Sequence, residues 1–100
     1  SESERGRLML SIAKILDEDL KQPDAAREML EMHISEVGLL GAGFKPLSSL
    51  LERQKDWPAL TKLLKDRSDA FIAKGDENAA TSLLERALQL NEQHMKDGSE

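Results

Sequence analysis

Apolar residues recur at intervals of three and four along most of the chain, which is the pattern of amphipathic helices. The pattern predicts five helices, at residues 4–20, 23–36, 45–54, 57–74 and 77–95. The apolar stripe of the first helix is formed by Leu8, Met9, Ile12, Ala13, Leu16 and Leu20. Because most connections are short, we expect consecutive helices to pack as antiparallel hairpins.

Residues with strong positional preferences mark several of the predicted helix ends. Pro23 fits the first turn of the second helix, where its missing N–H would have no partner. Asp56 is the predicted N-cap of the fourth helix, and Asp76 that of the fifth. Gly75 suits the left-handed position that ends the fourth helix.

One connection differs from the others because it is apolar and rich in glycine. Residues 38–44 read GLLGAGF. We expect Leu39, Leu40 and Phe44 to fill the gap between one hairpin and the next, since such side chains are unusual in a solvated loop.

A segment of the chain recurs in blurred form 34 residues later. Residues 21–30 read KQPDAAREML and residues 55–64 read KDWPALTKLL. Lys21 aligns with Lys55, and Leu30 aligns with Leu64. A period of this length is typical of stacked helical arrays.

Helix–turn–helix units at this spacing resemble tetratricopeptide (TPR) repeats. In the second repeat, residues 44–74, the matching positions are Phe44, Leu47, Ser48, Leu51 and Leu64, whereas Leu60 stands where the family normally has Ala. In the first repeat, whose turn is one residue longer, the matching positions are Met9, Ile12, Ala13, Leu16, Ala26 and Leu30. The Leu83–Ala87–Leu90 run resembles the first helix of a third repeat. The resemblance implies an all-α fold of about two and a half repeats, stacked as a right-handed superhelix. The family's Trp and Tyr in the first helix are absent, and no helix ends in the usual Pro.

The same resemblance implies a groove that binds a peptide or a partner protein. The outward positions of the first helix of each repeat would line it, namely Arg7, Lys14, Asp17, Glu18, Lys45, Ser49, Glu52 and Arg53. Ser49 stands where the family's carboxylate clamp has Asn. We therefore do not expect a receptor for chaperone tails.

Composition narrows the class of protein. The net charge of −5 disfavours a nucleic-acid surface, which needs a basic stripe. The chain has no cysteine, no visible signal peptide and no apolar run long enough to cross a membrane. We therefore expect a cytoplasmic protein that does not bind membranes. Residues 1–100 are expected to form a single domain, and because the chain does not begin with Met, we expect it to be a piece of a longer protein.

Catalytic chemistry is not visible in the sequence. His33 and His94 lie on separate predicted helices, the first expected to pack and the second to be solvated. The acidic run that starts at Asp17 does not continue as an EF-hand loop, because Gln22 stands at its sixth position instead of Gly. Phe44 stands where a phosphate-binding loop would have Lys. We expect no enzyme activity, no cofactor and no metal.

The sequence thus favours a non-catalytic scaffold for protein–protein interactions. One alternative is a structural domain whose copies pair through their terminal helices as a homodimer. A second alternative is a helical bundle that binds a ligand or acts as an enzyme, with residues 38–45 as its mouth.

Trp57 is expected to pack against neighbouring helices. If no further helix covers the fifth, Leu83, Leu84 and Leu88 would leave an apolar strip in water.

Overall fold

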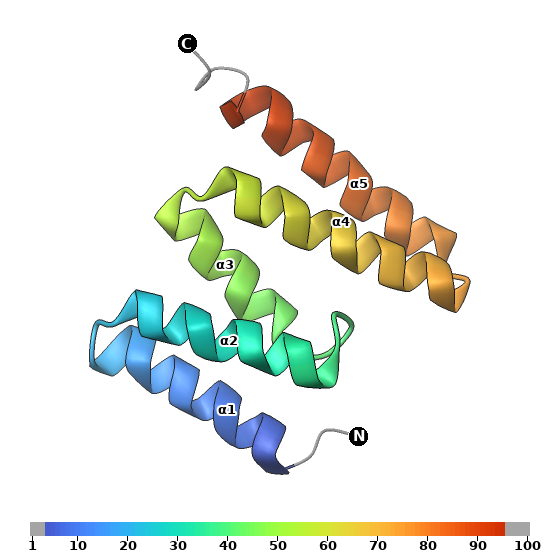
Figure 1. Ribbon diagram of the computed structural model, residues 1–100. Coiled ribbons are helices and arrows are strands. Elements are labelled where there is room, and N and C mark those ends of the chain that lie inside the picture. The colour runs from blue at the N-terminus through green and yellow to red at the C-terminus, as the bar shows by residue number, and fades with distance from the viewer. Residues whose placement is uncertain (1–3, 96–100) are drawn as a thin grey trace. The chain divides into compact units, whose positions relative to one another are not determined.

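The computed structural model describes residues 4–95 and confirms the all-α prediction, since every regular element in this range is a helix. The elements are α1 (Glu4–Lys14), η1 (Ile15–Asp19), α2 (Pro23–Val37), α3 (Phe44–Gln54), α4 (Trp57–Lys74), α5 (Glu77–Leu90) and η2 (Asn91–Met95), where η denotes a π-helix (Figure 1). The chain divides into two compact units, residues 1–50 and residues 51–100. Residues 44–50 of α3 belong to the first unit, and residues 51–54 belong to the second.

The first unit is built on an antiparallel hairpin of α1 and α2, with η1 against both (Figure 1). Its buried apolar side chains are Met9, Ala13, Ala26, Leu30, Leu47 and Leu50. Leu8 and Leu20 were predicted to face inward, and this is wrong, because they are 60% and 54% exposed. Met9 and Ala13, four residues apart, occupy the buried face of α1, and Leu8 is rotated by about 100° from Met9. Leu20 lies beyond the end of η1.

A close approach of backbone to side chain fixes the loop before α3. His33 on α2 is fully buried, as its expected packing role requires. A Cβ atom added to Gly43 would lie 2.5 Å from His33 Nδ1, so only glycine fits there. Leu39 and Leu40 of the same loop are half-buried, as is Phe44, the first residue of α3.

The second unit is built on an antiparallel hairpin of α4 and α5, with η2 packed against both helices (Figure 1). Its buried apolar side chains are Leu51, Leu60, Leu63, Leu64, Ala80, Ala87 and Leu90. The predicted caps are confirmed: Asp56 accepts a hydrogen bond from Ala59 N at 3.3 Å, and Asp76 accepts one from Ala79 N at 3.1 Å. Gly75 has the expected left-handed conformation, with a φ of 90°.

Three of the turns between helices share a left-handed residue followed by an N-cap residue. The left-handed residues are Lys21 (φ 56°), Lys55 (φ 58°) and Gly75. Lys21 and Lys55 are the two positions that the 34-residue alignment matches. Left-handed backbone is uncommon for residues other than glycine. Its occurrence at both lysines therefore means that the repeated sequence has a repeated backbone path at these two turns.

The π-helix η1 lies where the two aligned segments of the sequence differ by one residue. Seventeen positions separate Met9 from Ala26, whereas sixteen separate the matching Phe44 and Leu60. A π turn holds one residue more than an α turn, and Leu20 N donates to Ile15 O five residues earlier at 3.0 Å. The additional residue is therefore accommodated inside the helix, before the turn.

Candidate interaction groove on α4 and α5

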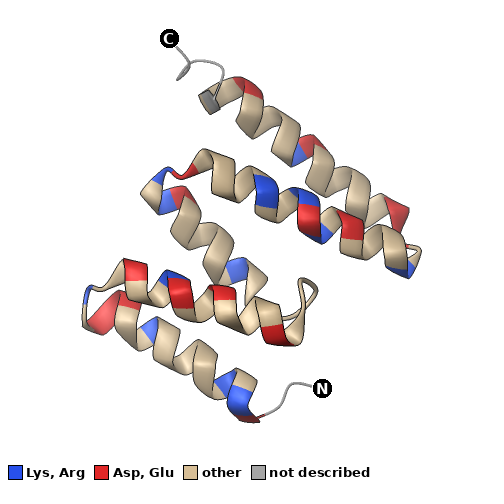
Figure 2. Cartoon of the chain, viewed as in Figure 1, with Lys and Arg blue, Asp and Glu red and all other residues tan. Residues whose placement is uncertain are grey.

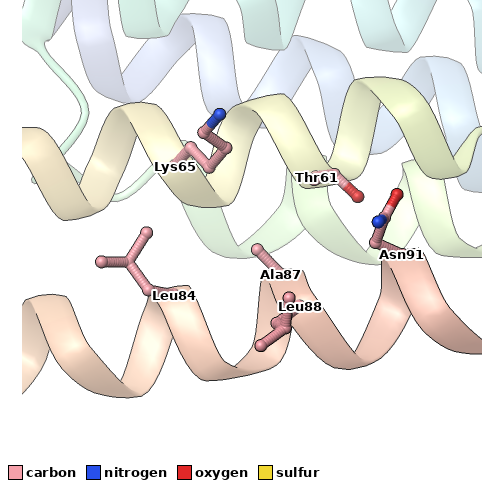
Figure 3. Close-up of a pocket in the computed structure, with 6 residues that line it drawn as sticks. All are labelled: Thr61, Lys65, Leu84, Ala87, Leu88 and Asn91. Carbon is pink, nitrogen blue, oxygen red and sulfur yellow. The ribbon is translucent and has the colours of Figure 1, made fainter.

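The antiparallel pairing of α4 and α5 leaves a groove on the surface of the second unit. Its larger part, ≈ 550 Å³, is lined by Thr61, Lys65, Leu84, Ala87, Leu88 and Asn91 (Figure 3). Its smaller part, ≈ 220 Å³, is lined by Ile72, Glu77, Ala80, Thr81 and Leu84. The two parts share Leu84, and their lining residues on α5 recur at spacings of three and four along one face of that helix. We therefore describe them together as the α4–α5 groove.

Exposed aliphatic side chains give the groove its character. Leu84 and Leu88 lie four residues apart, on one face of α5, and are 42% and 60% exposed. Ile72, near the end of α4, is 50% exposed. The predicted apolar strip is thus confirmed for Leu84 and Leu88, whereas Leu83 is half-buried. Contiguous apolar surface of this kind commonly marks an interaction site.

Polar groups stand at the two ends of the groove. The Thr61 hydroxyl and the Asn91 side chain lie at the same end (Figure 3). Thr61 Oγ1 is buried and has no hydrogen-bond partner within residues 4–95, which costs about 1–3 kcal/mol in general. Lys65 lines the same part of the groove, whereas Glu77 lines the part nearest the α4–α5 turn.

Few charges interrupt the α5 side of the groove. Across Glu77–Leu90 the charged residues are Glu77, Glu85 and Arg86 (Figure 2). Arg86 is used within the unit, because its Nη2 donates to Glu52 Oε2 at 2.7 Å. On α4, Lys62 donates to Asp66 Oδ2 at 2.9 Å, and this hydrogen bond raises the pKa of Lys62.

An aromatic stack holds η2 against the start of α4. The Trp57 and His94 rings lie 3.8 Å apart between centroids, at an interplanar angle of 12°. Trp57 therefore packs, as predicted. The prediction of a solvated His94 is wrong, because η2 extends the last helix and brings its ring, now half-buried, onto Trp57.

The residues predicted to line a groove lie on two elements of the first unit and on one that both units share. Arg7 and Lys14 are on α1, and Asp17 and Glu18 are on η1. The α3 positions are Lys45 and Ser49 in the first unit and Glu52 and Arg53 in the second. All eight are exposed except Asp17, which is half-buried. None of them lines the α4–α5 groove, whose residues the resemblance did not indicate.

The described part of the chain gathers no cluster of candidate metal ligands around either histidine. His33 lies in the first unit and His94 in the second. Within residues 4–95, His and acidic side chains do not gather in groups of three or more that could hold a metal ion. The helices in this range are also too short or too polar to cross a membrane.

Comparison with models of protein families, with curated proteins and with solved structures finds no match to this chain.

Proposed function

We propose that this chain is a non-catalytic protein-interaction module and that its principal contact surface is the α4–α5 groove. The observation that carries the proposal is the exposure of Leu84, Leu88 and Ile72 along one hollow. Burying them against a partner would gain roughly 25 cal/mol for each Å² of apolar surface removed from water. A groove between two helices suits an amphipathic helix, which presents apolar anchors at spacings of three and four.

The proposal includes TPR-like architecture, with about two and a half helix–turn–helix repeats in a right-handed superhelix. The left-handed backbone at Lys21 and Lys55, 34 positions apart, supports the repeat. The one-residue offset that η1 accommodates supports the matching of the first helices. The exposed side chains that were predicted to line a groove, from Arg7 to Arg53, form a second proposed surface for a peptide or partner protein.

The test is a selection of helical peptides from a display library against the whole chain. We expect selected peptides to bind the wild type and to lose about tenfold or more in affinity for Leu88→Glu. Leu8→Glu is the matched control, because Leu8 is also 60% exposed but lies on α1, outside the groove. Peptides that bind wild type and Leu88→Glu equally well, or a selection that yields no binder, would contradict the proposal.

A further inference from the structure

We propose that α5 and η2 together, residues 77–95, form a strap that opens locally from α4 while α4 stays folded. The hinge of the strap is the turn at Gly75, and its clasp is the stack of His94 on Trp57. Two buried hydroxyls of α4 lie between the hinge and the clasp and weaken the closed state. This inference goes beyond the proposed function, because it does not depend on what the α4–α5 groove binds.

The two hydroxyls lie on the face of α4 that meets α5. Thr61 and Ser68 are seven residues apart, which places them on one face of a helix, and Thr61 lines the α4–α5 groove. Ser68 is fully buried, and within residues 4–95 neither Ser68 Oγ nor Thr61 Oγ1 has a hydrogen-bond partner. Closing α5 onto α4 therefore removes both hydroxyls from water without replacing their hydrogen bonds, a cost that the open state avoids.

The apolar contact that opposes this cost is small on the α5 side. The buried apolar side chains of α5 are Ala80, Ala87 and Leu90, and two of these are single methyl groups. Leu84 and Leu88, which are larger, are exposed and contribute little to closure. Segments with few buried apolar contacts open at a lower free energy than the whole fold. We therefore expect α5 to open more readily than α4, whose buried face carries three leucines.

The two ends of the strap are held by different interactions. At the hinge, Gly75 is left-handed, with a φ of 90°, and Asp76 caps α5 by accepting a hydrogen bond from Ala79 N. This cap belongs to α5 and keeps the helix intact when it moves away from α4. At the other end, the His94 ring has to leave the Trp57 ring before the strap can open.

The test is amide hydrogen exchange of the whole chain, followed by NMR at urea concentrations below the unfolding transition. After correction for intrinsic rates, we expect the amides of Ala87 and Leu90 to exchange about tenfold or more faster than those of Leu63 and Leu64. Their exchange should depend little on urea, since a local opening exposes little surface. Equal protection of the two helices, with equal urea dependence, would mean that α5 opens only when the whole chain unfolds and would overturn the inference.

Removing either hydroxyl should hold the strap closed. Ser68→Ala and Thr61→Val should each slow the exchange of the α5 amides by about tenfold, which corresponds to about 1.4 kcal/mol. Ser82→Ala and Thr81→Val are the matched controls, because they make the same changes at exposed positions of α5. These controls should slow the exchange by less than about threefold, the size of the helix-propensity effect.

Removing the clasp should have the opposite effect. His94→Ala should speed the exchange of the α5 amides several-fold, whereas Gln93→Ala, at the exposed neighbouring position, should not. The inference is wrong if Ser68→Ala and Thr61→Val slow exchange no more than their exposed controls, or if His94→Ala leaves exchange unchanged. None of these results bears on the proposed function, which fails separately if selected helical peptides ignore Leu88→Glu.

Discussion

The turn before α2 and the turn before α4 follow the same backbone path with different local chemistry. Lys21 and Lys55 are both left-handed, and Ala26 N and Leu60 N each donate to the N-cap carbonyl, at 3.1 and 3.0 Å. The two turns differ in what precedes and caps them. The first follows a π-helix, and Gln22, the N-cap residue of α2, makes no side-chain cap hydrogen bond. The second follows an α-helix, and the Asp56 side chain caps α4.

The comparison shows which features recur after 34 residues and which do not. The left-handed residue and the two buried positions after it recur at 34 residues, even though Ala26 and Leu60 differ greatly in volume. The additional residue in the first region is taken up by the helix, and the cap is present in one region only. At these two turns the backbone path therefore recurs, whereas the side-chain packing differs between the two regions.

The largest expected effect is that of removing one residue from each region. Deleting Arg53 rotates the rest of α3 by about 100° relative to its turn and should cost more than about 4 kcal/mol. Deleting Glu18 converts the π turn of η1 into an α turn and should cost about 1 kcal/mol. Urea unfolding monitored by circular dichroism measures both. Equal losses would contradict the assignment of the additional residue to η1.

A somewhat smaller effect is expected from exchanging the matched core residues. Leu60→Ala leaves a cavity beside α4 and should cost about 2–5 kcal/mol. Ala26→Leu overfills the fully buried site on α2 and should cost about 1–3 kcal/mol. Both values follow from urea midpoints at constant slope. A neutral Ala26→Leu would show that the first region has the same space as the second.

Replacing the N-cap residue should lower the free energy of unfolding by about 1 kcal/mol more at the second turn than at the first. Asp56→Ala removes the hydrogen bond to Ala59 N and should destabilise the chain by about 0.5–2 kcal/mol. Gln22→Ala is the matched control and should change stability by less than about 0.5 kcal/mol, since Gln22 makes no side-chain cap. Thermal unfolding resolves this difference. A larger loss of stability for Gln22→Ala than for Asp56→Ala would contradict this prediction.

The smallest effect concerns a surface ion pair between the two helices of the first hairpin. Arg5 donates from Nε and Nη2 to Glu36 at 2.8 and 2.9 Å, and these hydrogen bonds lower the pKa of Glu36. A carboxyl whose pKa is lower in the folded state stabilises the fold above its unfolded pKa, and this contribution is lost as the pH falls through its folded pKa.

Arg5→Ala should therefore raise the pKa of Glu36 toward its ordinary value in an NMR titration. The stability difference between this variant and the wild type should be small at neutral pH and should vanish in acid. Arg86→Ala, which breaks the Glu52 pair of the second unit, should leave Glu36 unchanged. A Glu36 titration that is the same with and without Arg5 would show that the pair does not form in solution.

The sequence predicts helix ends well because short-range chemistry determines them. Asp56, Gly75 and Asp76 act through atoms a few residues away, and all three take the predicted roles. The exposure of Leu8 and Leu20 is decided by which face of α1 meets α2, and apolar spacing alone made the stripe too wide. The π-helix η1 left only an indirect trace in the sequence, the one-residue offset between the two aligned segments.

The candidate site was predicted only on its α5 side. Leu84 and Leu88 are visible as an apolar strip in the sequence because they lie four residues apart on one helix. Ile72, Lys65 and Thr61 join them only through the pairing of α4 with α5, and no spacing within α4 marks them. The stack of His94 on Trp57 likewise brings together residues that are far apart in the chain.

The most direct test of the central claim is hydroxyl-radical footprinting of two leucines that have the same exposure. Leu88 and Leu8 are both 60% exposed, the first in the α4–α5 groove and the second on α1. We expect similar oxidation of both in the free chain, and a several-fold drop at Leu88 alone when the groove is occupied by a selected peptide. Equal oxidation of Leu8 and Leu88 in the bound state would contradict the assignment of this groove as the interaction surface.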